Sequence, residues 1–158
     1  MKHTTGWRVW GVAAGWLLAG HALAANPVGY VKTVSGQASI TTSGKTQAAI
    51  LGTPVFEGSQ LQTGPSSSLG ITFKDETLMS FGPDTQMVVE EYLFAPSQGK
   101  LKLGSKLTKG TLNYISGSIA KLKPDAVSVG TPTGTIGVRG THFVLKVDEN
   151  GQTQTAEK

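Results

Sequence analysis

Hydrolytic catalysis needs a nucleophile, a base and an orienting group, and few side chains of this chain could supply them. The sequence has no cysteine, and His142 is the only histidine beyond the first 24 residues. No serine stands in a Gly-x-Ser-x-Gly elbow. A lone histidine beside Phe143, at the start of a strand pattern, is more often structural than catalytic. The chain is therefore predicted not to be an enzyme, and a serine-histidine-acid set through His142 remains the minor alternative.

Metal and cofactor chemistry have little support either. One histidine and no cysteine outside the N-terminal region exclude the usual zinc ligand sets. Asp75-Glu76 and Glu90-Glu91 are adjacent acidic pairs, whose carboxylates would face opposite sides of a strand. Two acids that meet only in space could serve a glycosidase, which the sequence neither indicates nor forbids. We expect no metal and no cofactor.

The segment Gly130–Phe143, GTPTGTIGVRGTHF, is the most informative part of the chain, with four glycines, four threonines and a single arginine, Arg139. A phosphate-binding loop would need Gly-Lys-Ser/Thr ahead of a helix, whereas a strand pattern follows here. Glycines of this density indicate tight turns or close backbone approach. Arg139 has two interpretations. It is either a latch that pairs with carbonyls or a carboxylate inside the fold, or a surface anchor for a partner.

This segment resembles the end of the FecR domain, the extracytoplasmic part of the FecR-type sigma regulators. The resemblance continues upstream through Gly58–Gly64, Ser67–Asp75 and Leu78–Pro83, in the family's turn-strand-turn order, and covers about Val28–Asp148. It implies a β-roll or solenoid-like fold and function by binding. The residues that carry the motif, for partner binding or for structure, are Thr131, Pro132, Gly137, Arg139, Gly140 and Thr141.

The first 24 residues have the composition of a secretory signal peptide. Lys2 and Arg8 are basic, Val9–Ala19 is an apolar run too short for a stable membrane span, and Ala22-Leu-Ala24 fits a signal peptidase site. We predict cleavage after Ala24, with an uncleaved anchor as the alternative. The expected product is periplasmic or secreted, without stable membrane insertion. The predicted division is a signal peptide over 1–24, a FecR-like all-β domain over 25–150 and a frayed polar tail over 151–158.

Charge argues against nucleic acid as a partner. Removing Lys2 and Arg8 from the 14 basic residues leaves 12 against 10 acids, a net charge of 12 − 10 = +2. The local density of lysines between Lys100 and Lys109 is better explained by a solvated strand face than by a binding stripe.

From Val28 onward, short alternating runs closed by Gly, Pro, Ser or Asn predict an all-β fold: a β-roll, a β-solenoid-like stack or a sandwich in one domain. Tyr30–Val34 and Gln37–Thr42 are expected to form a first hairpin. Gly104-Ser105 is expected to interrupt the strand that starts at Lys100, and Ser118–Lys123 could form a helical turn. Met87–Phe94 is predicted to be buried on both faces, or otherwise to offer an edge for strand addition.

The function predicted from these observations is a non-catalytic periplasmic FecR-like binding module, acting in envelope sensing or signalling through a protein partner. In full-length family members a cytoplasmic segment holds a sigma factor, and a signal peptide stands in that place here, so a free sensing or scaffold module is expected. One alternative is a structural protein that binds cell wall or polysaccharide, which Tyr30, Tyr92 and Tyr114 on one surface would favour. A small hydrolase would need a cleft joining His142 to an acid and a serine. A receptor-linked regulator would need an exposed Arg139. The sequence makes no prediction of the oligomeric state.

Overall fold

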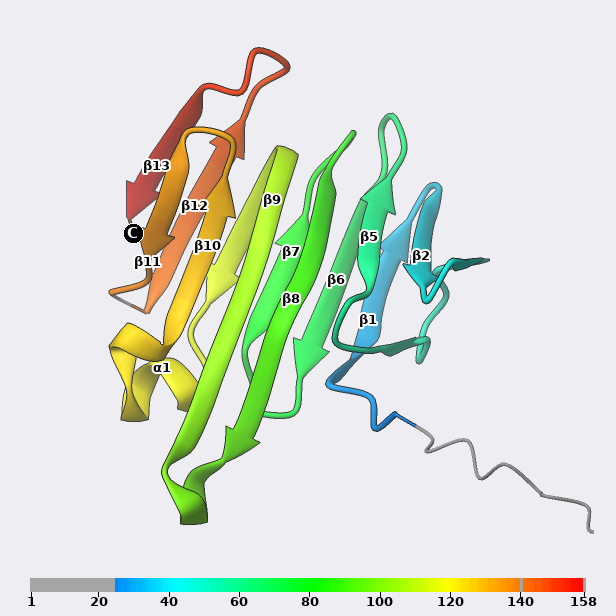
Figure 1. Cartoon of the computed structure of the whole chain (residues 1–158). Helices are drawn as coiled ribbons and strands as arrows, with labels where there is room; N and C mark the ends of the chain where they lie inside the picture. The colour runs from blue at the N-terminus through cyan, green and yellow to red at the C-terminus, as the bar shows by residue number, and fades with distance from the viewer. Residues whose placement is uncertain (1–24, 140, 158) are drawn as a thin grey trace, which may run out of the picture.

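A computed structural model describes residues 25–139 and 141–157 (Figure 1). The predicted signal peptide, with Ala22 and Ala24, lies outside the described residues, as does Gly140. Within these residues the chain is built almost entirely of short strands, which confirms the all-β prediction. No helix of the described part is long and apolar enough to span a membrane.

The strands form one curled, mainly antiparallel sheet, with the order β3-β2-β5-β8-β9-β7-β6-β1-β4 and with two further hairpins attached to β9. One part of the sheet, half-sheet B, contains β2 (Ala38–Thr42), β3 (Lys45–Ala48), β5 (Gln60–Thr63), β8 (Gln86–Ala95), β10 (Val127–Thr131) and β11 (Gly134–Gly137). The other, half-sheet A, contains β1 (Gly29–Ser35), β4 (Pro54–Val55), β6 (Ser68–Phe73), β7 (Leu78–Phe81), β12 (His142–Val147) and β13 (Thr153–Glu157).

The long strand β9 (Lys100–Ile115) belongs to both half-sheets. Its first part pairs with β8 and β10, and its last part pairs with β7 and β12. The register against β8 shifts between Leu107 and Lys109, and Gly110 follows with a φ of 95°. A bulge followed by a positive φ bends a strand sharply. β9 can therefore leave one half-sheet and continue in the other (Figure 1).

The core lies between the two half-sheets. In half-sheet A a buried row crosses neighbouring strands through the register-paired residues Val31, Ile71, Met79, Tyr114 and Phe143. In half-sheet B the corresponding row is Ile40, Leu61, Met87 and Leu107. Phe73 of β6 stacks on Tyr92 of β8, with ring centroids 5.4 Å apart, which joins the two half-sheets at one end. Strand alternation places these side chains inward and the polar ones outward.

Two strand predictions were wrong because pairing is decided by distant segments. Tyr30–Val34 and Gln37–Thr42 do not form a hairpin, since β1 pairs with β4 and β6 whereas β2 pairs with β3 and β5. Gln37 N–H instead donates to Ser67 Oγ at 2.8 Å, where the chain passes from one half-sheet to the other. Gly104-Ser105 does not interrupt β9, because strands on both sides complete the ladder at this point.

The described part of the C-terminal tail differs from the prediction as well. The polar tail expected to be frayed forms β13, which pairs with β12 from Phe143 to Val147. Asp148 makes the turn between them, because its Oδ1 accepts hydrogen bonds from Asn150 N–H at 3.0 Å and Gln152 N–H at 2.9 Å. A polar strand can persist here because β12 supplies a row of backbone partners.

Three short helical segments complete the described part: α1 (Ser118–Leu122) and the 3-10 turns η1 (Pro96–Gln98) and η2 (Pro124–Ala126). The helical turn predicted over Ser118–Lys123 is confirmed, and it buries Ile119. With η2, it forms the crossover that returns the chain from the end of β9 to β10, which lies parallel to the first part of β9.

Candidate functional site

The arginine segment, residues 130–143, begins in the hairpin of β10 and β11. The register places Thr131 opposite Gly134, and Thr131 Oγ1 donates to Gly134 O at 2.9 Å across the turn. Thr133 Oγ1 lies 2.8 Å from Thr153 Oγ1, which ties the turn to the start of β13. β11 pairs only with β10 among the described strands, so it is an edge. Threonine hydroxyls therefore fix the hairpin that leads to Arg139.

Arg139 lies on the surface, two residues after the end of β11. Its side chain is 84% exposed, and its Nη2 is 3.3 Å from Asp125 Oδ1, on a carboxylate that is itself 78% exposed. Ala120 and Pro124 complete a shallow hollow around this ion pair. An exposed pair of this kind contributes about 0–1 kcal/mol to stability. The carboxylate partner predicted for the latch is present, but outside the core, so the guanidinium remains available to another molecule.

The remaining residues of the motif divide into buried anchors and exposed positions. Thr131 is buried, whereas Pro132, Gly137 and Thr141 are exposed. Between them Val138 is buried, and its N–H donates to Val127 O at 3.2 Å. A Cβ added at Gly137 would meet nothing within 4 Å. Close backbone approach, which the glycine density suggested, is therefore not the reason for glycine at this position.

His142 is held by a neutral partner. Its Nε2 lies 2.6 Å from Asn113 Oδ1, on the neighbouring strand β9. No hydrogen bond or ion pair joins the ring to an acid or a serine among the described residues. The same residues contain no cluster of three His, Cys, Asp or Glu side chains that could hold a metal ion. The described residues therefore do not show His142 joined to an acid and a serine, which is the arrangement that the hydrolase alternative requires.

The sequence did not predict a buried polar site, which the structure forms around Asp75. Asp75, in the turn between β6 and β7, is 1% exposed. Its Oδ2 accepts hydrogen bonds from Thr77 Oγ1 at 2.7 Å and Ile119 N–H at 3.2 Å, and its Oδ1 accepts one from the Tyr92 hydroxyl at 3.1 Å. Among the described residues the groups that bind this carboxylate are neutral. They come from the turn, α1 and β8, so Asp75 acts as a bracket that joins these three elements. In the sequence, the acidic pair Asp75-Glu76 has no feature that distinguishes a buried carboxylate from a solvated turn.

The tyrosines do not form a common surface. Tyr114 is fully buried in the core, Tyr92 is half-buried with its hydroxyl on Asp75, and Tyr30 is exposed on the outer face of β1. Burial, and then the negative charge of Asp75, raises the pKa of the Tyr92 phenol well above its usual value. The arrangement that would have favoured a polysaccharide-binding surface is therefore absent from the described residues.

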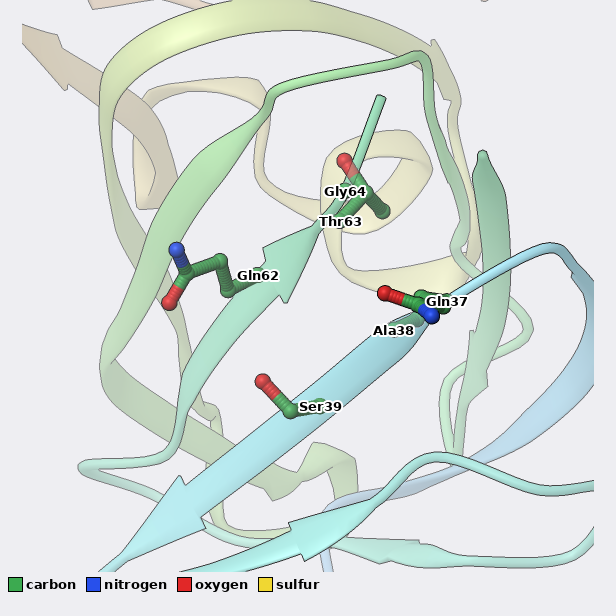
Figure 2. Close-up of a pocket in the computed structure, with 6 residues that line it drawn as sticks. All are labelled: Gln37, Ala38, Ser39, Gln62, Thr63 and Gly64. Atoms are coloured by element: carbon green, nitrogen blue, oxygen red, sulfur yellow. The ribbon is translucent and has the colours of Figure 1, made fainter. Parts of the chain in front are cut away.

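A second hollow lies over half-sheet B, where β2 and β5 run side by side (Figure 2). It is lined by Gln37, Ala38, Ser39, Gln62, Thr63 and Gly64. Amides and hydroxyls can donate and accept hydrogen bonds, but they offer no general acid or base near neutral pH. The hollow has the chemistry of a polar surface rather than of a catalytic centre.

These features define a class: a curled-sheet β domain with an exposed arginine at the end of an edge hairpin. Residues 59–157 match the family described as FecR protein, and the chain belongs to this family. The matched region includes β13, beyond the end of the predicted resemblance, and it begins at Ser59, after β1–β4. No curated protein matches the chain. No solved structure matches it either.

Proposed function

We propose that the protein is a non-catalytic binding module of the cell envelope, which takes part in sensing or signalling by binding another protein through the surface around Arg139. The observation that carries this proposal is the exposed guanidinium, whose one ion-pair partner among the described residues is an equally exposed carboxylate. Arginine is frequent in the energetic centres of protein interfaces because it offers both charge and planar hydrogen bonding. Membership of a regulatory and signalling family supports the same conclusion.

The proposal includes a periplasmic or secreted location, which rests on the signal sequence predicted for residues 1–24. Of the alternatives, the receptor-linked regulator is supported by the exposure of Arg139, which that hypothesis requires. The hypothesis of a structural protein that binds polysaccharide would have been favoured by three tyrosines on one surface, and this arrangement is not formed because Tyr114 is buried.

The test is affinity capture from the source envelope with three baits: the wild-type protein, Arg139→Ala and Lys121→Ala. Lys121 is an exposed cation in the last turn of α1, so its substitution removes the same charge near the same hollow. We expect a protein partner that is captured by the wild type and by the Lys121 variant and is lost with the Arg139 variant. Circular dichroism establishes that all three baits are folded.

Equal capture by all three baits would exclude a role for Arg139 in binding. Capture of cell-wall glycan without any protein would replace the proposal by the structural alternative.

A further inference from the structure

Strand β8 is paired along both edges only in its first half. β5 pairs with it from Gln86 to Val88, and the last bonds on that side join Val89 to Gly58 and Ser59. The register against β9 then shifts between Val89 and Glu91, and from Glu91 to Ala95 β9 is the only partner among the described strands. The prediction that Met87–Phe94 is buried on both faces was wrong for this half, where Leu93 is 45% exposed. The described strands instead leave an open edge here, which is the alternative predicted for this segment.

The backbone on this open edge already binds an acceptor. Tyr92 N–H donates to Glu57 Oε2 at 2.9 Å, so the peptide groups of Tyr92 point away from β9. Because these directions alternate along an antiparallel strand, the N–H and C=O of Phe94 point to the same side. No backbone group of the described residues pairs with Phe94 on that side. The Glu57 carboxylate thus occupies the place that a carbonyl of an added strand would take.

A groove runs along the same edge. It encloses about 380 Å³ between the segment that precedes β1 and the end of β8, and its lining is Asn26, Pro27, Val28, Lys74, Tyr92, Leu93 and Phe94. The edge is held in place, because Tyr92 stacks on Phe73 and its hydroxyl is bound by Asp75. A rigid edge loses little conformational entropy on binding. Lys74 is exposed and makes no ion pair with any described residue.

We propose that the open edge of β8 binds an extended segment of a partner protein by strand addition, with an acidic side chain of that segment placed against Lys74. A carbonyl of the segment displaces Glu57 from Tyr92 N–H, and Tyr92 and Phe94 together offer up to four backbone hydrogen bonds. An apolar side chain of the segment fills the hollow beside Phe94 and Pro27. Alternating donors and acceptors at strand spacing match a peptide backbone, and pockets for alternate side chains give the selectivity.

This inference goes beyond the proposed function, because it assigns a different surface and the conformation of what binds there. β8 and β10 flank β9 on opposite sides, and the arginine segment continues from β10. The two sites are therefore separable by mutation.

The first experiment selects ligands from a library of random linear heptapeptides displayed on phage, with the protein produced from the 158-residue chain as the target. We expect enrichment of proline-free sequences in which Asp or Glu alternates with β-branched or aromatic residues. Phe94→Pro serves for counter-selection, since it removes one outward N–H and proline is tolerated on edge strands. Failure to enrich any sequence over this variant, or enrichment of basic peptides, would overturn the proposal.

The second experiment measures the affinity of the selected peptide by titration calorimetry. We expect Lys74→Gln to weaken it at least fivefold, and to have no effect on a peptide in which the acidic residue is an amide. Lys32→Gln, which removes an exposed lysine of β1 outside the groove, should leave the affinity unchanged. Glu57→Gln should tighten binding severalfold, because a neutral amide competes less well for Tyr92 N–H, and misfolding cannot produce such a gain. Arg139→Ala should have no effect.

Three results would refute the proposal that this edge binds a segment of a partner protein by strand addition. One is equal affinity for a peptide whose backbone is N-methylated at alternate positions. Another is an equal loss with Lys74→Gln and Lys32→Gln. The third is self-association of the protein that Phe94→Pro abolishes, which would assign the edge to a second copy of the chain. A loss of peptide affinity with Arg139→Ala alone would instead support the proposed function and contradict strand addition at β8.

Discussion

The bend in β9 gives the sharpest prediction, because one glycine lies at the point where the strand changes half-sheets. We consider Gly110→Ala. Gly110 has a φ of 95°, a conformation that L-residues with a side chain rarely adopt. A Cβ at this position would overlap the Cα and the hydroxyl of Thr85. Thr85 cannot move freely, because its Oγ1 accepts from Thr111 N–H at 3.0 Å and its own N–H donates to Thr63 Oγ1 at 2.9 Å.

Two contributions add up in the expected loss of stability. Placing alanine at a positive φ costs about 1–2 kcal/mol. Forcing an extra carbon against a packed backbone costs about 1–3 kcal/mol more. We therefore expect Gly110→Ala to lower the free energy of unfolding by about 2–5 kcal/mol. This is a large part of the total stability of a domain of this size.

Urea unfolding followed by circular dichroism measures this loss, and two glycines provide matched controls. Gly99 has a φ of 64° and open space around it, so Gly99→Ala carries only the conformational cost of about 1–2 kcal/mol. Gly137→Ala carries neither cost and should change stability by less than about 0.5 kcal/mol. If Gly110→Ala were no more destabilising than Gly99→Ala, the claim that close packing against Thr85 fixes the bend would be refuted.

Three further predictions concern the bracket, the core and the surface. Asp75→Ala should cost about 3–5 kcal/mol in urea unfolding, because it leaves buried donors of Tyr92, Thr77 and Ile119 unsatisfied; a loss below 1 kcal/mol would mean that the bracket is not structural. Burial raises the pKa of the Tyr114 phenol from 10.0 to about 12. The unfolded chain therefore loses this proton at a lower pH than the folded protein, so the free energy of unfolding is unaffected below pH 10 and falls as the pH rises from 10 to about 12. Urea midpoints that do not fall over this range would contradict that assignment. Arg139→Ala should change the free energy of unfolding by less than about 0.5 kcal/mol, and a larger loss would make the residue a structural latch.

Local chemistry was sufficient to predict much of the fold. The alternation of Leu69, Ile71 and Phe73 with polar residues predicts a strand with one buried face, and the structure buries all three. The helical turn at Ser118 followed from the same kind of local reasoning. These features depend on side chains within a few positions of one another, which is the range over which periodicity carries information.

From the sequence, the candidate site could be predicted only as a segment of unusual composition. The glycine and threonine content, the single arginine and the family resemblance all pointed to residues 130–143, but not to whether Arg139 is internal or exposed. That distinction depends on Asp125, a residue of η2 that only the crossover between β9 and β10 brings near the end of β11. The bracket around Asp75 likewise joins a turn, a strand and a helix that are separated by up to 44 positions.

The sequence alone therefore predicts the type of structure: short strands, their buried faces, several of the turns and the family. The pairing of the strands, the position of the bend in β9 and the open backbone groups at the end of β8 follow from the tertiary structure alone. The physical reason is that strand pairing and burial are set by contacts between distant segments, whose free energies depend on the register and packing of the whole sheet. The side chains of a strand alternate between its two faces whether its edge is paired or open. The sequence of the strand therefore does not show whether another strand lies beside it.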